Sequence, residues 1–119
     1  MFKQMHKVED LKIWKKSMEL TTSVYKICKE LPLDEKFGLI SQIKRSAVSI
    51  PSNIAEGAGR NSKKEFAHFL SIANGSTYEL QTQLMLSMEL KLISTETINP
   101  ILENIIEIQK MNYGLQKSL

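Results

Sequence analysis

The chain of 119 residues is poor in cysteine, glycine and proline, and it contains no long apolar run. Its single cysteine, Cys28, cannot form a disulfide within the chain, so a disulfide-stapled secreted scaffold is excluded. Five Gly and three Pro exclude a collagen-like or Pro/Gly-rich disordered chain. The apolar runs are far shorter than the roughly 20 residues that span a bilayer, and the first residues are too polar for a signal peptide. We therefore expect a cytoplasmic protein without a membrane segment.

Motifs of catalysis and of metal binding are missing as well. His6 and His68 are far apart and have no companion cysteines, so the spacing of a zinc site is absent. The sequence has no glycine-rich phosphate loop, no dinucleotide fingerprint and no nucleophile elbow. Cys28 falls on an apolar helix face and is interpreted as a small buried hydrophobe, and His68 as a surface or interface residue. We predict no enzymatic activity, no metal site and no cofactor.

Helical spacing fills the chain, with almost no strand signal. The 42% of hydrophobic residues suffice for one compact domain over residues 1–119. Apolar residues recur every three or four positions in four segments, at about 10–31, 35–58, 63–92 and 95–117. Because short connections favour antiparallel neighbours, we predict an all-α, up-down-up-down four-helix bundle.

The first predicted helix carries two apolar stripes, which lie about 100° apart around its axis. Asp10 is its expected N-cap, and Pro32 ends it because proline disfavours the α region at the preceding residue. One stripe suffices for packing within a bundle, so two stripes indicate burial over a wider arc, such as burial against a second subunit. The first stripe holds Leu11, Trp14, Met18, Tyr25 and Cys28, and the second holds Ile13, Leu20, Val24, Ile27 and Leu31.

The second predicted helix contains Pro51 in the middle of an apolar register that begins at Phe37. Its expected N-cap is Asp34. Proline has no N–H, and its ring clashes with the carbonyl group of Ala47. Because the apolar register continues past the proline, we predict a kink at Pro51 rather than a break.

Glycines mark the end of the second helix and interrupt the third. Gly57 and Gly59 can supply the left-handed residue that closes the second helix. The third helix opens on a capping box, with Ser62 as the cap and Glu65 at its third position. Gly75 lies inside that helix, where glycine costs about 1 kcal/mol relative to alanine. We expect the close approach of another backbone as the compensation.

The start of the fourth helix is ambiguous in the sequence. Ser94 or Thr95 can cap it, which places Pro100 in its second turn. Alternatively, Asn99 caps it and Pro100 takes the first helical position, where proline is favoured.

The segment from Arg45 to Arg60, RSAVSIPSNIAEGAGR, resembles the signature of a bacterial four-helix-bundle family, the 23S ribosomal RNA intervening-sequence proteins. The opening DLKIW at 10–14 and the residues from Phe66 to Glu79 fit further motifs of that family, so the resemblance covers nearly the whole chain. It implies a left-handed bundle that assembles into a ring, typically a homopentamer, with no established enzymatic activity. The family is also similar to the accessory variability protein of diversity-generating retroelements, a basic pentamer that works with a reverse transcriptase and nucleic acid.

Polar residues of this motif fall on one side of the second helix, opposite its apolar side. They are Arg45, Ser49, Asn53 and Glu56. In one interpretation they form hydrogen bonds and ion pairs between helices or subunits, with Glu79 among the partners, because arginine suits multi-donor contacts. In the other, the stripe lines a groove or pore that contacts phosphate or another anion.

Positive charge gathers in the first half of the chain. Residues 1–64 hold 13 Lys and Arg against 7 Asp and Glu, whereas residues 65–119 hold 3 against 6. The first turn of the third helix adds free N–H groups, and the alternative is an ordinary solvated loop. No aromatic residue is interleaved with these charges, so a platform for base stacking is not evident. The candidate nucleic-acid or anion contacts are Lys44, Arg45, Arg60, Lys63 and Lys64.

Three functions remain open from the sequence. The first, which we favour, is a non-enzymatic, ring-forming bundle that binds nucleic acid, above all RNA, or a nucleoprotein. The second is a protein–protein interaction scaffold that binds no nucleic acid. The third is an enzyme that uses Arg45, Ser49 and Glu56, which would lack an activated nucleophile, a metal cluster and a cofactor motif.

Overall fold

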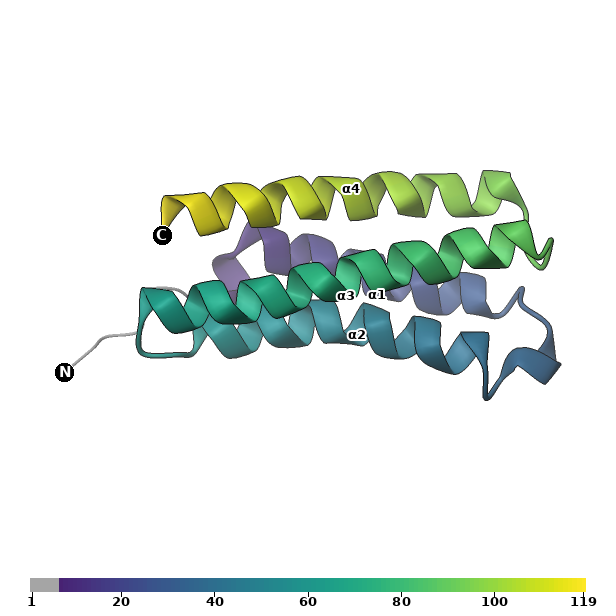
Figure 1. The fold of residues 1–119 in the computed structure, drawn as a ribbon, viewed down its shortest axis with the longest axis horizontal. Coiled ribbons are helices and arrows are strands. Elements are labelled where there is room, and N and C mark those ends of the chain that lie inside the picture. The colour runs from purple at the N-terminus through teal and green to yellow at the C-terminus, as the bar shows by residue number, and fades with distance from the viewer. Residues whose placement is uncertain (1–6) are drawn as a thin grey trace.

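The computed structural model describes residues 7–119, which form four α-helices, two short 3₁₀ helices and no strand. Figure 1 shows the four long helices side by side, with consecutive helices running in opposite directions along a molecule of 52 × 24 × 19 Å. The predicted all-α four-helix bundle is confirmed. The helices are α1 (Lys12–Cys28), α2 (Leu39–Ala58), α3 (Lys63–Glu89) and α4 (Thr95–Ser118), and η1 (Val8–Asp10) and η2 (Leu33–Glu35) precede α1 and α2.

Each helix packs against two neighbours, in the cyclic order α1, α2, α3, α4 and back to α1. The aliphatic side chains that point into this cycle make one core, and each fully buried side chain contributes about 1.5–3 kcal/mol. The second stripe of α1 is buried along its whole length. The largest fully buried aliphatic side chains are Leu20, Val24, Ile43, Ile50, Ile54, Leu70, Leu80, Leu84, Ile98, Ile105 and Ile108.

The first helix is shorter than predicted at both ends. Asp10 is not its N-cap, because residues 8–10 form the 3₁₀ turn η1 and the extended residue Leu11 precedes the helix without a side-chain cap. The helix ends at Cys28, and Leu31 is buried in the turn that follows. In the first apolar stripe Met18 and Tyr25 are exposed, so its burial against a second subunit stays a prediction.

The second helix begins later than predicted. Asp34 lies in η2, and Gly38 takes the N-cap position of α2. Phe37 therefore precedes the helix, and its side chain is 91% exposed rather than part of the core. The helix continues through Pro51 without a break, as expected, and the kink of its axis stays a prediction.

The predicted left-handed glycine at the end of α2 is wrong. None of the glycines in residues 7–119 has a positive φ, and Gly59 caps the helix in the right-handed region, with φ of −84°. Its N–H donates to the carbonyl of Ala55 over 3.1 Å. Gly57 is needed for packing, because a Cβ there would lie 2.8 Å from Cβ of Phe69 in α3.

The starts of α3 and α4 follow the sequence closely. The side chain of Ser62 accepts the N–H of Glu65 over 3.1 Å, as a capping box requires. The side chain of Ser94 accepts the N–H of Thr97 over 3.2 Å, so Ser94 caps α4 and Pro100 lies in its second turn. The first of the two predicted starts is therefore correct.

The third helix ends at Glu89, three residues before the predicted end. Lys91, with φ of 59°, turns the chain toward α4. The approach of another backbone to Gly75 does not occur within the described chain, because a Cβ there would meet nothing within 4 Å. Gly75 lies on the exposed side of α3.

Candidate anion-binding site

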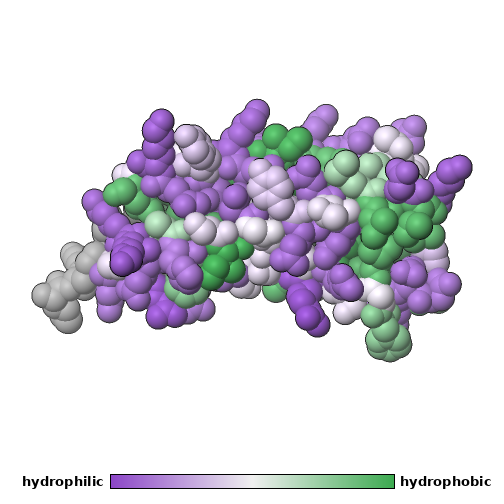
Figure 2. All heavy atoms as spheres, in the orientation of Figure 1, coloured by the Kyte–Doolittle hydropathy of each residue, from purple (hydrophilic) through white to green (hydrophobic). Residues whose placement is uncertain are grey.

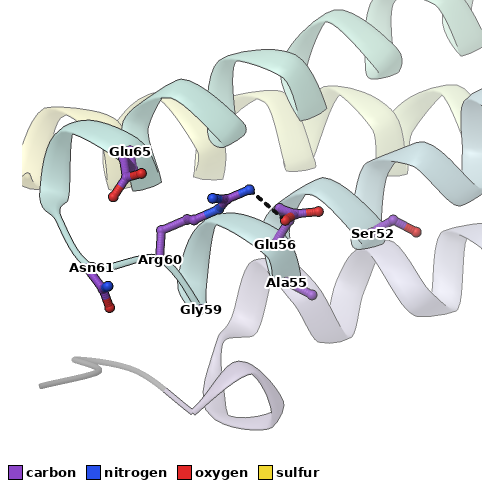
Figure 3. A pocket seen from close by; sticks show the side chains of 7 residues that line it. All are labelled: Ser52, Ala55, Glu56, Gly59, Arg60, Asn61 and Glu65. Atoms are coloured by element: carbon purple, nitrogen blue, oxygen red, sulfur yellow. Dashed lines mark hydrogen bonds and ion pairs between the residues drawn. The ribbon is translucent and has the colours of Figure 1, made fainter.

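The turn after α2 and the first turn of α3 hold three of the five predicted anion contacts, Arg60, Lys63 and Lys64. Figure 3 shows the side chain of Arg60 extending back along α2 toward Glu56. Nη2 of Arg60 lies 2.9 Å from Oε2 of Glu56, and its guanidinium carbon lies 4.8 Å from the ring centroid of Phe69. Arg60 is therefore already held by a carboxylate and an aromatic ring.

A hollow of about 690 Å³ opens beside this turn. One guanidinium, that of Arg60, and two carboxylates, those of Glu56 and Glu65, line it (Figure 3). The N–H of Glu65 is also taken, since it donates to the side chain of Ser62. An anion in this hollow would meet two carboxylates and one cation, so the balance of charge does not favour it. The other lining residues are Ser52, Ala55, Gly59 and Asn61.

Lys44 lies far from that turn. It precedes Arg60 by 16 residues of sequence, or about 24 Å along a helix that rises 1.5 Å per residue. Its side chain instead reaches α1, where Nζ lies 4.8 Å from the ring centroid of Tyr25. The five predicted contacts therefore do not form one site.

Lys44 contributes to a second hollow, of about 500 Å³, between α1 and α2. Two further lysines, Lys26 and Lys29, line it together with apolar groups, and no carboxylate does. Within residues 7–119 the ion pairs are Lys16–Glu107 and Arg60–Glu56, so none of these three lysines is paired. This lysine hollow, as we name it, is lined by Thr21, Thr22, Tyr25, Lys26, Lys29, Lys44 and Val48.

Lys26 and Lys29 were missed in the sequence. Their spacing of three residues places them on one side of α1, which was a readable signal. These two lysines line one hollow with Lys44 and Tyr25 because of the way in which α1 and α2 are aligned. The periodicity of a single helix does not predict that alignment. The structure thus brings an aromatic ring to the charges where the sequence suggested none.

The middle of the predicted polar stripe connects α2 with α3. The side-chain amide of Asn53 donates to the carbonyl oxygen of Ser49 over 2.8 Å and to its Oγ over 2.9 Å. Oγ of Ser49 lies 2.8 Å from Oγ of Ser76 in α3. These two members of the stripe therefore form an interhelical network, as one of the two interpretations expected.

The ends of the stripe do not belong to that network. Glu56 is bonded to Arg60. Arg45 lines a third hollow, of about 290 Å³, together with Glu79 and Gln83 of α3. Its guanidinium forms no ion pair with Glu79, although the two residues share this hollow.

The other residues singled out in the sequence are Cys28, His68 and His6. Cys28 is buried, and burial raises the pKa of its thiol while the nearby Lys44 ammonium lowers it to a smaller extent. His68 is exposed, with its ring edge-on to Phe69 at 5.2 Å between centroids. His6 lies outside the described residues. In residues 7–119 no three His, Cys, Asp or Glu side chains gather as metal ligands, and no helix has the length and apolarity to cross a membrane.

Comparisons with known proteins agree with the motif and the fold. A family model described as "23S rRNA-intervening sequence protein" matches residues 9–114. The crystal structure of a protein with unknown function from the S23 ribosomal protein family of Bacteroides thetaiotaomicron is 29% identical, with a TM-score of 0.82 over 88% of this chain and 98% of that one. No curated protein matches the sequence. The family model covers most of the chain and confirms the resemblance, and the chain belongs to the family of 23S rRNA-intervening sequence proteins.

Proposed function

We propose that this chain is a non-enzymatic module that binds nucleic acid, above all RNA, and that it acts as a homo-oligomeric ring. The lysine hollow carries the proposal, because three lysines line it and no carboxylate does. A phosphate in this hollow would meet positive charge from its lining and no negative charge. Nucleic acid is the partner that supplies phosphates in series.

The surface of α1 extends this positive charge. At 100° per residue Lys12, Lys15, Lys26 and Lys29 fall within an arc of about 100° on the helix. All four are exposed, and two carboxylates lie in the same arc, Glu19 within the row and Glu30 at its end. The row spans about 26 Å at 1.5 Å per residue, which is long enough to follow several phosphates of a strand.

Ring formation is proposed from the family resemblance. In a ring each basic surface is repeated once per subunit, so weak contacts with one polyanion add up by avidity. Light scattering tests ring formation, and the molar mass that it measures is expected to lie well above that of one chain. A species of 13.6 kDa at micromolar concentration would contradict it.

The RNA proposal is tested by fluorescence anisotropy with a labelled RNA over a range of salt concentrations. The logarithm of the binding constant is expected to fall linearly with the logarithm of salt concentration, because bound lysines release counterions. The double variant K26E/K29E is expected to weaken binding about 10-fold or more and to reduce the salt slope. The matched variant K63E/K64E changes the net charge equally at the turn, and we expect a smaller loss. A native protein without salt-dependent binding to RNA or DNA would refute the proposal.

A protein–protein scaffold is the second candidate function, and exposed apolar side chains favour it. Figure 2 shows apolar side chains over the end of the bundle where α1 connects to α2 and α3 to α4. Leu33, Phe37, Leu86 and Leu90 are exposed at these connections and at the end of α3. A partner that co-purifies after nuclease treatment, and that F37S releases, would favour this alternative.

A further inference from the structure

The lysine hollow has an apolar wall that phosphate binding alone does not require. Tyr25 and Val48 line it while remaining 41% and 40% exposed. The threonine hydroxyls are already used, since Thr21 donates toward the carbonyls of Ser17 and Ala47 and Thr22 donates to that of Met18. The hollow therefore offers an apolar surface, with the ammonium groups and the Tyr25 hydroxyl as its donors.

We propose that the lysine hollow binds one nucleotide unit of single-stranded RNA, with the phosphate among the three lysines and the base against Tyr25 and Val48. This inference rests on the proposed function for the choice of nucleic acid. It goes further by naming the unit that is bound and the groups that select it.

The size and the charge of the hollow both fit this ligand. Its volume of about 500 Å³ lies within the range of small-molecule and cofactor sites. The hollow beside Arg60 contains two carboxylates, and the one beside Arg45 contains one. A fourth hollow, of about 380 Å³ beside Tyr113, also lacks a carboxylate, but a single lysine, Lys117, lines it. The lysine hollow differs from it in having three lysines.

The position of Lys44 links the phosphate to the base. Its Nζ lies 4.8 Å from the centroid of the Tyr25 ring, so a phosphate bound to Lys44 is held beside that ring. The base attached to this phosphate then comes within reach of the ring. Stacking of a base on an aromatic ring stabilises single-strand complexes whatever the base, so little sequence preference is expected. A duplex keeps its bases stacked inside and can offer the hollow only its phosphates.

The native protein is titrated separately with adenosine 5′-monophosphate, ribose 5-phosphate and adenosine. Binding is measured from the NMR chemical shifts of the backbone amides of α1 and α2. We expect the nucleotide to bind about 5-fold or more tightly than ribose 5-phosphate, the gain that base stacking provides. It should also bind more tightly than adenosine, which lacks the phosphate. K29Q is expected to weaken the binding of both phosphate-bearing ligands, adenosine 5′-monophosphate and ribose 5-phosphate. Y25L keeps an apolar side chain but removes the ring. Its affinity for the nucleotide should fall to its affinity for ribose 5-phosphate.

Tyr113 provides the matched control. It is an exposed tyrosine in α4, with Nζ of Lys117 lying 5.9 Å from its ring centroid. It lines a different hollow, which has one lysine instead of three. Y113L should bind all three ligands as the native protein does. Equal affinities for the nucleotide and ribose 5-phosphate, or equal behaviour of Y25L and Y113L, would overturn the nucleotide site.

RNA binding is measured in parallel, so that the two proposals can fail separately. A 10-nucleotide single strand should lose affinity on Y25L, whereas a blunt-ended RNA duplex without unpaired bases should not. Salt-dependent RNA binding that Y25L and K29Q leave unchanged overturns the nucleotide site and leaves the proposed function standing. Nucleotide binding at the hollow without binding of any RNA or DNA polymer refutes the proposed function and supports the hollow as a mononucleotide site. The inference requires a ring that leaves Tyr25 open, although the stripe of α1 that contains Tyr25 was predicted to pack against a second subunit. Shifts at the hollow that follow protein concentration instead of ligand would assign it to that contact and overturn the inference.

Discussion

The side-chain hydroxyl of Thr21 in α1 donates to the carbonyl oxygen of Ala47 in α2 over 3.1 Å. That carbonyl has no donor four residues later in its own helix, because Pro51 has no N–H. Ala47 is fully buried, and a buried carbonyl without a partner is costly. The same hydroxyl lies 2.8 Å from the carbonyl of Ser17, so its hydrogen is shared between two helices. α1 thus supplies the hydrogen bond that the proline removes from α2.

Replacing Thr21 with valine should reduce the free energy of unfolding by about 1–3 kcal/mol. The two side chains have nearly the same shape, so the loss reports the hydroxyl and the carbonyl it leaves unpaired. Urea denaturation measures it. T22V is the matched control, because Thr22 is exposed and bonds only within α1, and we expect it to change stability by less than about 0.5 kcal/mol.

A double-mutant cycle with P51A isolates this relationship. Alanine at this position restores an N–H that can donate to Ala47, so T21V should cost less in the P51A background than in the native one. We expect a coupling free energy of about 0.5–3 kcal/mol between the two substitutions. Strict additivity would show that Thr21 does not compensate for Pro51.

The two helical glycines Gly57 and Gly114 should respond in opposite ways to alanine. Alanine generally improves a helix by about 1 kcal/mol over glycine. At Gly57 its Cβ would lie 2.8 Å from Cβ of Phe69 and 3.2 Å from the carbonyl oxygen of Phe66, so overpacking of about 1–3 kcal/mol should dominate. At Gly114 nothing lies within 4 Å of the added Cβ. Thermal unfolding should show G57A below the native protein and G114A above it, and the reverse order would contradict this packing.

The buried amide of Asn112 should make a carboxylate substitution sensitive to pH. Asn112 is 1% exposed, and its Nδ2 donates to the carbonyl oxygen of Leu70 over 2.9 Å. In N112D, burial raises the pKa of the new carboxyl in the folded state above its value of about 3.9 in the unfolded chain. The stability of the N112D variant is therefore greatest below the unfolded-state pKa of about 3.9, and it is lost as pH rises through the folded-state pKa.

We expect N112D to unfold about 3–5 kcal/mol more easily than the native protein at pH 7, with the difference shrinking toward pH 4. Thermal unfolding across this range measures it. N99D is the matched control, since Asn99 is exposed in α4 and its charge remains in water. A pH-independent loss in N112D would mean that the site admits water.

The core residues within a helix could be predicted from their spacing. The exposure of the residues just before a helix could not. Ile43, Ile50 and Ile54 follow helical periodicity and are fully buried in α2. Phe37 continues the same spacing toward the N-terminus and is exposed, because the 3₁₀ turn after Pro32 delays the start of the helix. Apolar periodicity therefore identifies a helical face but does not say where the helix begins.

The candidate site was predictable only where its contacts lie within one helix. Glu56 and Arg60 are four residues apart, so their ion pair could have been predicted from the sequence, which instead suggested Arg60 as an anion contact. Lys44 and Tyr25 are separated by nineteen positions and a turn, and they meet because α1 and α2 pack in one particular alignment. The charge surplus of the first half was correct as a count, but its distribution between paired and unpaired lysines required the packed bundle.

The thiol of Cys28 should make the native protein less stable in alkaline solution. Burial raises the pKa of this thiol above its ordinary value, and the Lys44 ammonium opposes the shift to a smaller extent. A folded pKa above the unfolded one means that the thiol's contribution is fully present below the unfolded pKa, near 8.5, and is lost as pH rises through the folded value. Urea denaturation from pH 7.5 to 10 should show this loss in the native protein, and C28A should lack that part of it.

The influence of Lys44 on Cys28 is testable through thiol reactivity. The thiolate is the reactive form, so removing the ammonium with K44Q should raise the thiol pKa further and slow labelling by a disulfide reagent at pH 9. K29Q is the matched control, because it removes an exposed lysine of the same hollow that does not contribute to the shift. In urea all three proteins should label at one rate, which separates the electrostatic effect from reagent access. Equal native rates for K44Q and K29Q would contradict the coupling, since only Lys44 acts on the thiol through its charge.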